Sequence, residues 1–394
     1  MAGVTGSDDA IRSIAIISNA AQSLSNFRGP LIAAMVARGW TVHALAPDYD
    51  EPLRAAVRSL GAHPADIALD RAGIRPLHDL AAMVRLARLL RQLRVDATFA
   101  YFIKPVIFGT LAAALARVPH RFALVAGLGY IFTDDGVQNA RRRLLRRIAS
   151  TLYARAFGVV TRVFFQNADD LAELSRITGL PPGKAVLTNG TGVDLDRLQA
   201  EALPTGAPVF LYVGRLLREK GVEELVEAAR IVRAAHPDVR VRLVGGFDVN
   251  PGSFDADHVA RHAWRDAVEL PGHVDDVAGE LARCTVFVLP SWREGKPRST
   301  QEALATARAV ITTDAPGCRD TVVDGENGFL VPLRSPAALA AAMLRFVENP
   351  DLAATMGVRS RALAEERFDT RKINAGIIDV MTAAASTCVR SARH

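Results

Sequence analysis

The sequence predicts a doubly wound α/β fold in two successive halves. Short apolar segments typical of buried strands alternate with helical segments, and a Pro/Gly stretch at residues 203–208 separates the two series. With 394 residues, 49% hydrophobic and 23% charged, the chain can form two globular domains. We therefore expect an N-terminal domain at 12–202, a C-terminal domain at 203–368 and a last helical segment at 369–394.

Each half contributes six strand candidates. In the first half these are residues 13–18, 41–46, 96–102, 122–126, 163–166 and 185–187. In the second half they are residues 209–213, 239–244, 268–270, 285–289, 309–312 and 328–331. Helices are predicted at 222–234 and, separated by a break, at 362–367 and 372–385. Because ligands of such sheets bind at the carboxyl ends of the strands, functional residues are expected just after these segments.

Composition excludes several classes of protein. Three cysteines, Cys284, Cys318 and Cys388, are far apart without C-x-x-C spacing, which argues against a disulfide framework or zinc site and fits a reducing compartment. Cys284 opens a strand and is expected in the core. The N-terminal residues lack a basic region followed by an apolar stretch, so we expect no signal peptide. No stretch approaches 18 uncharged apolar residues, so we expect no membrane span.

The charge is unevenly distributed. Residues 1–200 hold 24 Lys+Arg against 16 Asp+Glu, a net charge of +8, whereas residues 201–394 hold 24 against 26, a net charge of −2. The first half is therefore expected to favour an anionic surface or substrate, and the second half is not.

Residues 290–302, P-S-W-R-E-G-K-P-R-S-T-Q-E, carry the strongest functional signal. They follow an apolar strand candidate, and Ser299 and Thr300 predict that a helix starts beside them. The N–H groups at such a helix start attract phosphate. Glu294 and Glu302 can hydrogen-bond hydroxyl groups on either side of that phosphate. The inferred ligand has hydroxyl groups, a diphosphate and more hydroxyl groups, which describes a nucleotide sugar.

The setting of these two glutamates supports a family resemblance, whereas a bare Glu-x7-Glu spacing is common on helical surfaces. The pattern P-S-x-R-E-G-x-P-x-S is followed by V-I-T-T-D-A-P-G-C-R from residue 310 and D-G-E-N-G-F-L-V-P from residue 324. Together they resemble the donor site of family 4 retaining glycosyltransferases. The resemblance implies the GT-B fold: two Rossmann-like doubly wound domains facing across a cleft, with the last helix crossing back onto the first domain. From the residues alone, that helix is equally consistent with a plain terminal helix.

A second motif, G-R-L-L-R-E-K-G at residues 214–221, follows the first strand of the second half and resembles the family spelling G-R-L-x-x-E-K-G. Arg215 and Lys220 can neutralise a donor diphosphate and stabilise the leaving nucleoside diphosphate. The alternative is two surface charges on a loop. Gly214 and Gly245, each after a strand, are expected to let the ligand approach the backbone closely.

The donor loop supplies further expected contacts. Glu294 would hold sugar hydroxyls and Glu302 the ribose hydroxyls. Relatives often carry an apolar residue at position 296, so the lysine here bears on which sugar is accepted. The remaining donor contacts are Lys296, Pro297 and Arg298 against the sugar and the N–H groups of Ser299 and Thr300 at the phosphate. The residues expected to act in catalysis are Arg215, Lys220 and Glu294.

The nucleobase site follows from the resemblance. In relatives, the loop matching L-P-G-H-V, residues 270–274, holds the base through backbone groups, which implicates Val274. His273 beside it is expected to be a solvated loop residue and not a general base.

Three motifs of the first half resemble a bacterial subgroup that adds sugars to lipid-linked oligosaccharides. They are S-L-x-x-F-R-G-P from residue 23, Y-F-I-K-P from residue 101 and V-A-G-L-G-Y-I-F from residue 125. The Gly-Gly pair that many relatives have in the first of these loops is missing. The acceptor-binding candidates are Asn26, Arg28, Lys104 and Tyr130. A structural role explains each of these residues equally well.

Residues 141–147, R-R-R-L-L-R-R, hold five arginines and no acid. Continued as a helix, they place Leu144, Leu145, Ile148 and Leu152 in one apolar stripe. One interpretation is a helix lying on an anionic bilayer, where each arginine contributes roughly 1 kcal/mol. The other is a basic helix whose stripe packs on its own domain. Nucleic acid is not expected, because no aromatic interleaving or recognised module accompanies the arginines.

Two D-x-D patterns, Asp48-x-Asp50 and Asp194-x-Asp196, have the spelling of a metal site of other transferases. Neither follows an apolar strand in the required way, and Asp194 looks like a helix start. Because cationic side chains are available for the diphosphate, we expect no metal, and no cofactor beyond the donor substrate.

These observations predict a retaining hexosyl- or N-acetylhexosaminyltransferase that uses a UDP-sugar and a polyprenyl-diphosphate-linked saccharide in surface polysaccharide or glycan assembly. We expect it in the cytoplasm, peripheral on the inner face of the cell membrane. One alternative is a nucleotide-sugar 2-epimerase of GT-B architecture, although no acid–base cluster is visible in the first domain. The other is a non-catalytic nucleotide-sugar-binding subunit, against which the intact catalytic candidates argue.

Overall fold

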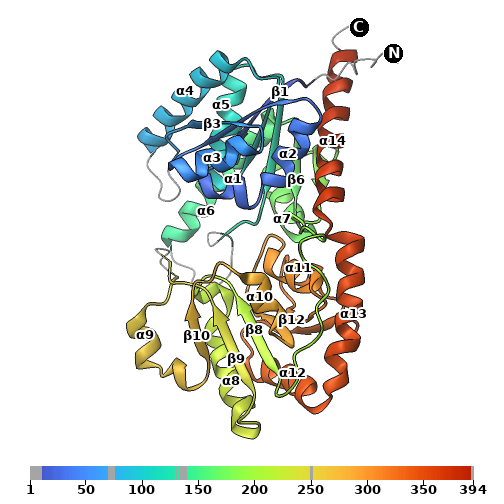
Figure 1. The fold of residues 1–394 in the computed structure, drawn as a ribbon. Helices are drawn as coiled ribbons and strands as arrows, with labels where there is room; N and C mark the ends of the chain where they lie inside the picture. The colour runs from blue at the N-terminus through green and yellow to red at the C-terminus, as the bar shows by residue number, and fades with distance from the viewer. Residues whose placement is uncertain (1–10, 70–75, 130–131, 133–139, 249–251, 392–394) are drawn as a thin grey trace, which may run out of the picture. The chain divides into compact units, whose positions relative to one another are not determined.

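The structure, a computed structural model, describes residues 11–69, 76–129, 132, 140–248 and 252–391, with the backbone alone at 76, 141–142 and 388–391. It divides into two compact units (Figure 1). Unit 1 comprises Met1–Ala126, Asn139–Thr188 and Arg371–His394, and unit 2 comprises Gly127–Gln138 and Asn189–Thr370. The chain therefore passes between the units at 126/127, 138/139, 188/189 and 370/371. The last two boundaries compare with 202/203 and 368/369 expected from the linker and the helix break, whereas the first two were not predicted. Each unit holds one parallel sheet with helices, which confirms the α/β class.

The sheet of unit 1 has the strand order β3-β2-β1-β4-β5-β6-β7 over the described residues. The strands are β1 (Ser13–Ile17), β2 (Thr41–Ala46), β3 (His63–Asp66), β4 (Ala97–Tyr101), β5 (His120–Val125), β6 (Arg162–Phe165) and β7 (Ala185–Leu187). The central strands β1 and β4 are almost wholly buried, as in a parallel sheet that is covered on both faces. Strand β3, H-P-A-D, was not predicted, because its sequence is polar and contains a proline. Such a segment is tolerated as a strand only at the edge of a sheet, which is where β3 pairs with β2.

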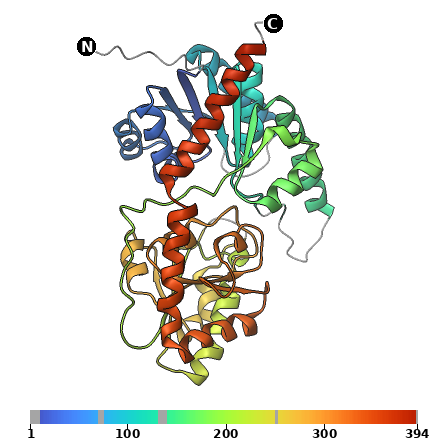
Figure 2. The same ribbon diagram turned by 90° about the vertical axis from the view of Figure 1, so that its right-hand side faces the viewer.

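The helices of unit 1 include one from the far end of the sequence. They are α1 (Ala21–Asn26), α2 (Gly29–Ala37), α3 (Glu51–Ser59), α4 (Pro76–Leu93), η1 (Pro105–Gly109), α5 (Thr110–Leu115), α6 (Ala140–Val159), α7 (Ala168–Thr178), η2 (Pro182–Lys184) and, all but its first residue, α14 (Thr370–Ser391). Ile377 and Met381 of α14 are buried in one core cluster with Ile14 and Leu31. Figure 2 shows α14 in red along the blue N-terminal strands and helices of unit 1.

The sheet of unit 2 has the strand order β10-β9-β8-β11-β12-β13 over the described residues. Its strands are β8 (Val209–Val213), β9 (Arg240–Val244), β10 (Glu269–Gly272), β11 (Val286–Leu289), β12 (Ala309–Thr313) and β13 (Gly328–Val331). Its helices are η3 (Arg218–Lys220), α8 (Val222–Ala235), α9 (Ala256–Arg261), η4 (Trp264–Asp266), α10 (Val277–Ala282), α11 (Arg298–Ala305), η5 (Arg319–Thr321), α12 (Pro336–Glu348) and α13 (Pro350–Arg367). All six strands predicted for this half are present. Cys284 is buried in this core, as expected.

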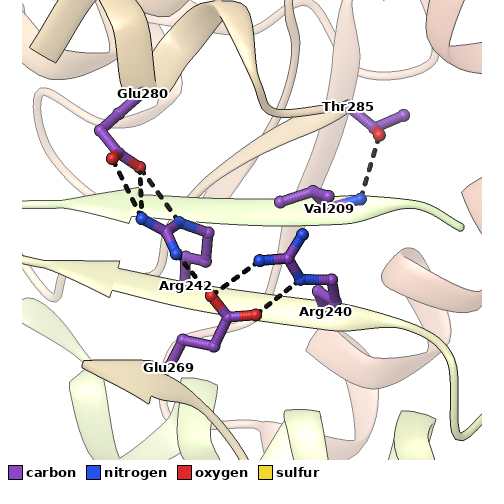
Figure 3. Close-up of polar contacts among 6 residues, drawn as sticks. All are labelled: Val209, Arg240, Arg242, Glu269, Glu280 and Thr285. Atoms are coloured by element: carbon purple, nitrogen blue, oxygen red, sulfur yellow. Dashed lines mark hydrogen bonds and ion pairs between the residues drawn. The ribbon is translucent and has the colours of Figure 1, made fainter. Parts of the chain in front are cut away.

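Four charged side chains fix the edge of this sheet (Figure 3). Arg240 of β9 donates to Glu269 of β10 through Nε, at 2.6 Å from Oε1. Arg242, two residues along β9, contacts the same Glu269 and also Glu280 of α10, with Nη2 2.9 Å from Oε2. Hydrogen bonding from Arg240 lowers the pKa of Glu269. The network holds β10 and α10 against β9, and with them the loop between β10 and α10 that contains Val274.

Arg308, just before β12, is fully buried and ties together segments distant in sequence. Its guanidinium donates to the carbonyls of Leu281 and Ala282, at the end of α10, at 2.8 and 3.1 Å. It also donates to the carbonyls of Glu201 and Ala202, at 2.9 and 3.1 Å. The carbonyls at a helix end have no intrahelical donor, so this one side chain caps α10 and anchors the segment before β8.

Candidate active site

The strand order places most of the charged site candidates after the strands at which the order reverses in each sheet. In unit 2 the order reverses between β8 and β11, and in unit 1 between β1 and β4. Ligands of open α/β sheets bind outside the carboxyl ends of the strands at such a point. The connections after β8 and β11 carry Arg215, Lys220 and Glu294. In unit 1, Lys104 follows β4 directly, and Arg28 lies between α1 and α2 in the connection from β1 to β2.

An ion pair joins the loops after β8 and β11 in unit 2. Lys220 Nζ contacts Glu294 Oε1, and the two side chains are 20% and 13% exposed. The backbones also meet, because the N–H of Trp292 donates to the carbonyl of Glu219 at 2.9 Å. At Gly221, where φ is +70°, a Cβ would lie 2.1 Å from the carbonyl oxygen of Pro290. The loops after β8 and β11 are therefore packed as one piece, with a cation and a carboxylate side by side.

The loop after β12 fixes Glu294 from another direction. The N–H of Glu294 donates to the carbonyl of Pro316 at 3.0 Å. At Gly317, where φ is +77°, a Cβ would lie 2.3 Å from the carbonyl oxygen of Glu294, so only glycine fits there. This contact explains the glycine of the D-A-P-G-C-R motif. Burial raises the pKa of the adjacent Cys318 thiol to about 12, which makes it unreactive at neutral pH.

Arg215 has a carboxylate partner that sequence reasoning missed. Its Nη1 lies 2.8 Å from Oδ2 of Asp248, in the loop after β9. Tyr212, fully buried on β8, donates its hydroxyl to the carbonyl of Arg215 at 2.8 Å, and burial raises the pKa of this tyrosine. The sequence signal was a lone aspartate just after the Gly-Gly pair that ends β9.

Helix α11 starts at Arg298, as predicted from the Ser-Thr pair. The first N–H groups of a helix have no intrahelical acceptor and lie at the positive end of the helix dipole. Thr300 is fully buried, and its hydroxyl donates to the carbonyl of Pro297 at 2.8 Å. Glu302 accepts from Nε of Arg298 at 2.9 Å. Burial raises the pKa of Glu302, and the Arg298 guanidinium opposes that shift.

Lys296 lies inside unit 2 with only 8% of its side chain exposed. Its Nζ is 3.4 Å from Oδ1 of Asn189 and 3.7 Å from Oδ2 of Asp320. Burial lowers the pKa of this lysine, and Asp320 opposes the shift. Contact between Lys296 and a donor sugar stays a prediction.

The glycine and nucleobase candidates lie at the ends of β8, β9 and β10. At Gly245, where φ is +148°, a Cβ would lie 1.8 Å from the carbonyl oxygen of Gly214. The close approach of the neighbouring strand end therefore requires glycine at this position, whether or not a ligand binds there. Val274 is half-buried against the core of unit 2. His273 is 80% exposed, with Nε2 3.6 Å from Asp275 Oδ1, as expected of a solvated loop residue.

In unit 1, two acceptor candidates are held by neighbouring side chains. Arg28 is 2% exposed, and its guanidinium carbon lies 5.0 Å from the ring centroid of Tyr101 at the end of β4. Lys104 Nζ lies 2.8 Å from Oδ1 of Asp79 at the start of α4, and both side chains are largely buried. Asn26, the last residue of α1, is exposed.

The fourth acceptor candidate, Tyr130, lies outside the described residues. The loop that carries it begins at Gly127, which belongs to unit 2. A Cβ on Gly127 would lie 3.0 Å from the backbone nitrogen of Gly295, next to Glu294. The carbonyl of Phe132 accepts from Arg293 at 3.4 Å. Gly127 and Phe132, on either side of Tyr130 in the sequence, therefore both lie beside the loop after β11.

Helix α6 buries one apolar face and exposes another. Its buried residues are Ala149, Tyr153, Ala156 and Phe157. None of the four residues of the apolar stripe predicted from the sequence is on this buried face. Leu144 and Ile148 are 58% and 39% exposed, and Leu145 and Leu152 are partly buried. Arg143 and Arg147 are exposed, and Arg146 Nη2 lies 2.5 Å from Glu173 of α7. The exposed half of the stripe is thus flanked by arginines.

One aspartate of each D-x-D pattern has a structural role. Asp50 caps α3, accepting from the N–H of Leu53 at 2.8 Å. Asp194 Oδ1 accepts from the N–H groups of Asp196 and Arg197 in a turn, where a helix start was expected. Within the described residues, no three His, Cys, Asp or Glu side chains are grouped so that they could hold a metal ion.

Comparison with protein families gives two matches. Residues 207–349 match the glycosyl transferases group 1 family, and residues 27–190 match the glycosyl transferase 4-like domain. The first covers most of unit 2 and the second most of the N-terminal part of unit 1.

Individual relatives share moderate identity. Over 354 residues the chain is 29% identical to the N,N'-diacetylbacillosaminyl-diphospho-undecaprenol alpha-1,3-N-acetylgalactosaminyltransferase of Campylobacter jejuni, covering 86% of this chain and 90% of that protein. It is 27% identical over 283 residues to the capsular polysaccharide biosynthesis glycosyltransferase CapM of Staphylococcus aureus, covering 68% and 72%. Among solved structures, Anabaena HepE in complex with UDP-glucose superposes with a TM-score of 0.75 at 18% identity, covering 94% of this chain and 99% of that one. Sucrose-phosphate synthase from Thermosynechococcus elongatus gives a TM-score of 0.75 at 20% identity, covering 95% and 100%.

Proposed function

The chain belongs to the family 4 glycosyltransferases of GT-B fold, and from this premise we propose that it transfers a sugar from a UDP-sugar to a polyprenyl-diphosphate-linked saccharide, with retention at the anomeric carbon. The observation that carries the proposal is the pairing of Lys220 with Glu294 at the strand-order reversal of unit 2. In the proposal, this cation binds the diphosphate and the neighbouring carboxylate binds the sugar. The acceptor class rests on the C. jejuni relative, whose name specifies a diphospho-undecaprenol-linked acceptor, and the donor base on HepE, solved with UDP-glucose.

The mechanism assigns one task to each group. The donor diphosphate binds the N–H groups at the start of α11 and the side chains of Arg215 and Lys220. Glu294 holds the sugar hydroxyls and Glu302 the ribose. As the bond from the anomeric carbon to the diphosphate oxygen breaks, the two cations stabilise the charge on the leaving UDP. The acceptor hydroxyl attacks from the same face, and its proton passes to the departing phosphate oxygen. This course requires no metal.

The acceptor diphosphate is assigned to unit 1. Arg28 and Lys104 are cations in the connections that follow β1 and β4, the two strands at its strand-order reversal. Neither the epimerase nor the binding-subunit alternative is favoured, because the relatives are named as transferases.

The donor can be identified by thermal shift and then by transfer. UDP and UDP-sugars are expected to raise Tm more than GDP and GDP-sugars, because preferential binding to the folded state at a hundred times Kd adds about 2.7 kcal/mol to its stability. Glu302→Gln, which removes the carboxylate assigned to the ribose, is expected to reduce the shift. The best donor should then add one sugar to a polyprenyl-diphosphate-linked saccharide, measured by mass spectrometry. A donor that is epimerised without acceptor, as followed by NMR, would contradict the transferase.

Helix α6 is the part of the protein that we propose binds the membrane. Over the described residues, no helix is both long and apolar enough to cross a bilayer. We assign the exposed Leu144 and Ile148 of α6, flanked by Arg143 and Arg147, to the surface of an anionic bilayer, where the lipid-linked acceptor resides. The proposed location is accordingly the cytoplasmic face of the cell membrane, with the enzyme bound peripherally.

Flotation with vesicles tests this assignment. Arg143→Gln/Arg147→Gln is expected to lower partition onto anionic vesicles about thirtyfold, since each arginine contributes roughly 1 kcal/mol. Leu144→Ser/Ile148→Ser should also reduce it, and neutral vesicles should bind poorly. The matched control is Arg261→Gln/Arg265→Gln in exposed positions of unit 2, which removes the same charge. Equal flotation of wild type and all three variants would rule out α6 as the anchor.

A further inference from the structure

The loop after β9 lies along the loop that carries the diphosphate-binding candidates. The N–H of Leu216 donates to the carbonyl of Gly246 at 3.0 Å, and the N–H of Arg218 donates to the carbonyl of Gly252 at 2.9 Å. In the opposite direction, the N–H of Phe254 donates to the carbonyl of Leu216 at 3.0 Å. Leu217 and Ser253 form an antiparallel bridge. The loop after β9 therefore packs along the loop after β8 and is hydrogen-bonded to it.

Asp248 lies in the loop after β9, and a hydrogen bond holds its backbone in place. Its N–H donates to the hydroxyl of Ser253 at 2.8 Å, and Ser253 Oγ also contacts the carbonyl of Leu216 at 3.4 Å. The Asp248 side chain is 13% exposed, whereas that of its partner Arg215 is 49% exposed. The ion pair thus joins a buried, anchored carboxylate to the more exposed guanidinium at a distance of 2.8 Å.

The two cations assigned to the diphosphate form ion pairs with carboxylates that have different roles. Lys220 pairs with Glu294, which the proposed function places on the sugar. Arg215 pairs with Asp248, to which the proposed mechanism gives no contact with donor or acceptor. A guanidinium has five N–H donors in a fixed plane, so an ion pair made through Nη1 leaves donors for a phosphate while restricting the rotation of the side chain.

We infer that Asp248 is a positioning residue for the leaving diphosphate: it holds the Arg215 guanidinium in one orientation before the donor binds. This inference rests on the proposed function. Preorganised charge stabilises a transition state better than charge that must be reoriented during the reaction. Loss of the Asp248 carboxylate should therefore lower kcat more than it changes KM for the donor, because charge on the diphosphate grows as the bond to the sugar breaks.

The experiment is a double-mutant cycle between Asp248→Ala and Arg215→Ala, with kcat and donor KM measured for all four proteins. Asp248→Ala is expected to lower kcat about tenfold in the wild-type background and to have no further effect in the Arg215→Ala background. Asp248→Asn, which keeps an oxygen acceptor without the charge, should give an intermediate kcat. Asp257→Ala, an exposed carboxylate on α9 in the same β9–β10 connection, should leave kcat unchanged.

The outcomes separate this inference from the proposed function. If Arg215→Ala itself leaves kcat unchanged, the role of Arg215 in the proposed function fails, and the inference fails with it. If Arg215→Ala slows transfer but Asp248→Ala costs the same factor in both backgrounds, Asp248 acts only through the fold of its loop. That result would overturn the inference and leave the proposed function standing. If Asp248→Ala does not fold, the same double-mutant cycle with Asp248→Asn distinguishes the two outcomes, because that variant keeps the side-chain volume and a hydrogen-bond acceptor.

Discussion

Lys220→Ala is expected to lower kcat of sugar transfer about a hundredfold or more, the size of effect seen when one charge-stabilising donor is lost from an active site. The variant removes a cation from the leaving diphosphate and leaves Glu294 without its ion-pair partner from the loop after β8. Single-turnover rates at saturating donor would measure the chemical step directly. Arg215→Ala should reduce kcat by a similar factor, because the two cations are assigned to the same leaving group.

Arg218→Ala is the matched control for both variants. Arg218 lies in the same loop, but its side chain is 58% exposed and its Nε is 4.0 Å from Glu223 Oε2. Its removal should change kcat little. Near-normal turnover in both Lys220→Ala and Arg215→Ala would show that the diphosphate is stabilised elsewhere. Equal losses in all three variants would point to a general effect of charge or of loop stability.

Arg308→Met is expected to give the largest loss of stability, lowering the free energy of unfolding of unit 2 by about 3 kcal/mol. The variant removes the donors to four carbonyls, two at the end of α10 and two in the segment before β8. A fall in Tm of roughly 6–12 °C should follow for a domain of this size. Differential scanning calorimetry measures it, and residues 201–202 should exchange amide hydrogens faster.

Arg265→Met provides the control for this stability change, since Arg265 is exposed on η4 and the substitution is identical. Its Tm should stay within about 1 °C of wild type, as for a surface substitution worth less than 0.5 kcal/mol. Arg308→Lys keeps the charge with fewer directed donors and should fall between the two. A Tm for Arg308→Met equal to that of wild type would mean that other groups satisfy these carbonyls.

The sequence was sufficient for the fold class, because buried parallel strands are apolar almost throughout and are separated by helical segments. It failed at β3, whose polar sequence becomes a strand only through pairing with β2 at the sheet edge. In the candidate site, the contact between Lys220 and Glu294 was predictable in outline, since both follow strands that are neighbours in a doubly wound sheet. The partner of Arg215 was not, because it depends on how the loop after β9 folds along the loop after β8.

Helix α6 shows a different limit of sequence reasoning. Its sequence contains two apolar stripes, one through Leu144 and Ile148 and one through Ala149 and Tyr153. The sequence analysis identified only the first of these, and helical periodicity does not say which apolar stripe is buried. The structure buries the second stripe, and the arginines flank the first. Lys296 is a similar case, because its burial against Asn189 and Asp320 depends on segments far away in the sequence.

The position of α14 has a consequence for how the chain matures on the ribosome. Unit 1 contains the first strands to be synthesised, yet its core includes Ile377 and Met381 of α14. All of unit 2 is translated before that helix emerges. The later lobe can therefore be complete while the earlier one still exposes the apolar surface that α14 will cover, a state prone to aggregation. Nascent chains paused before residue 371 should accordingly recruit chaperones to the lobe that was made first.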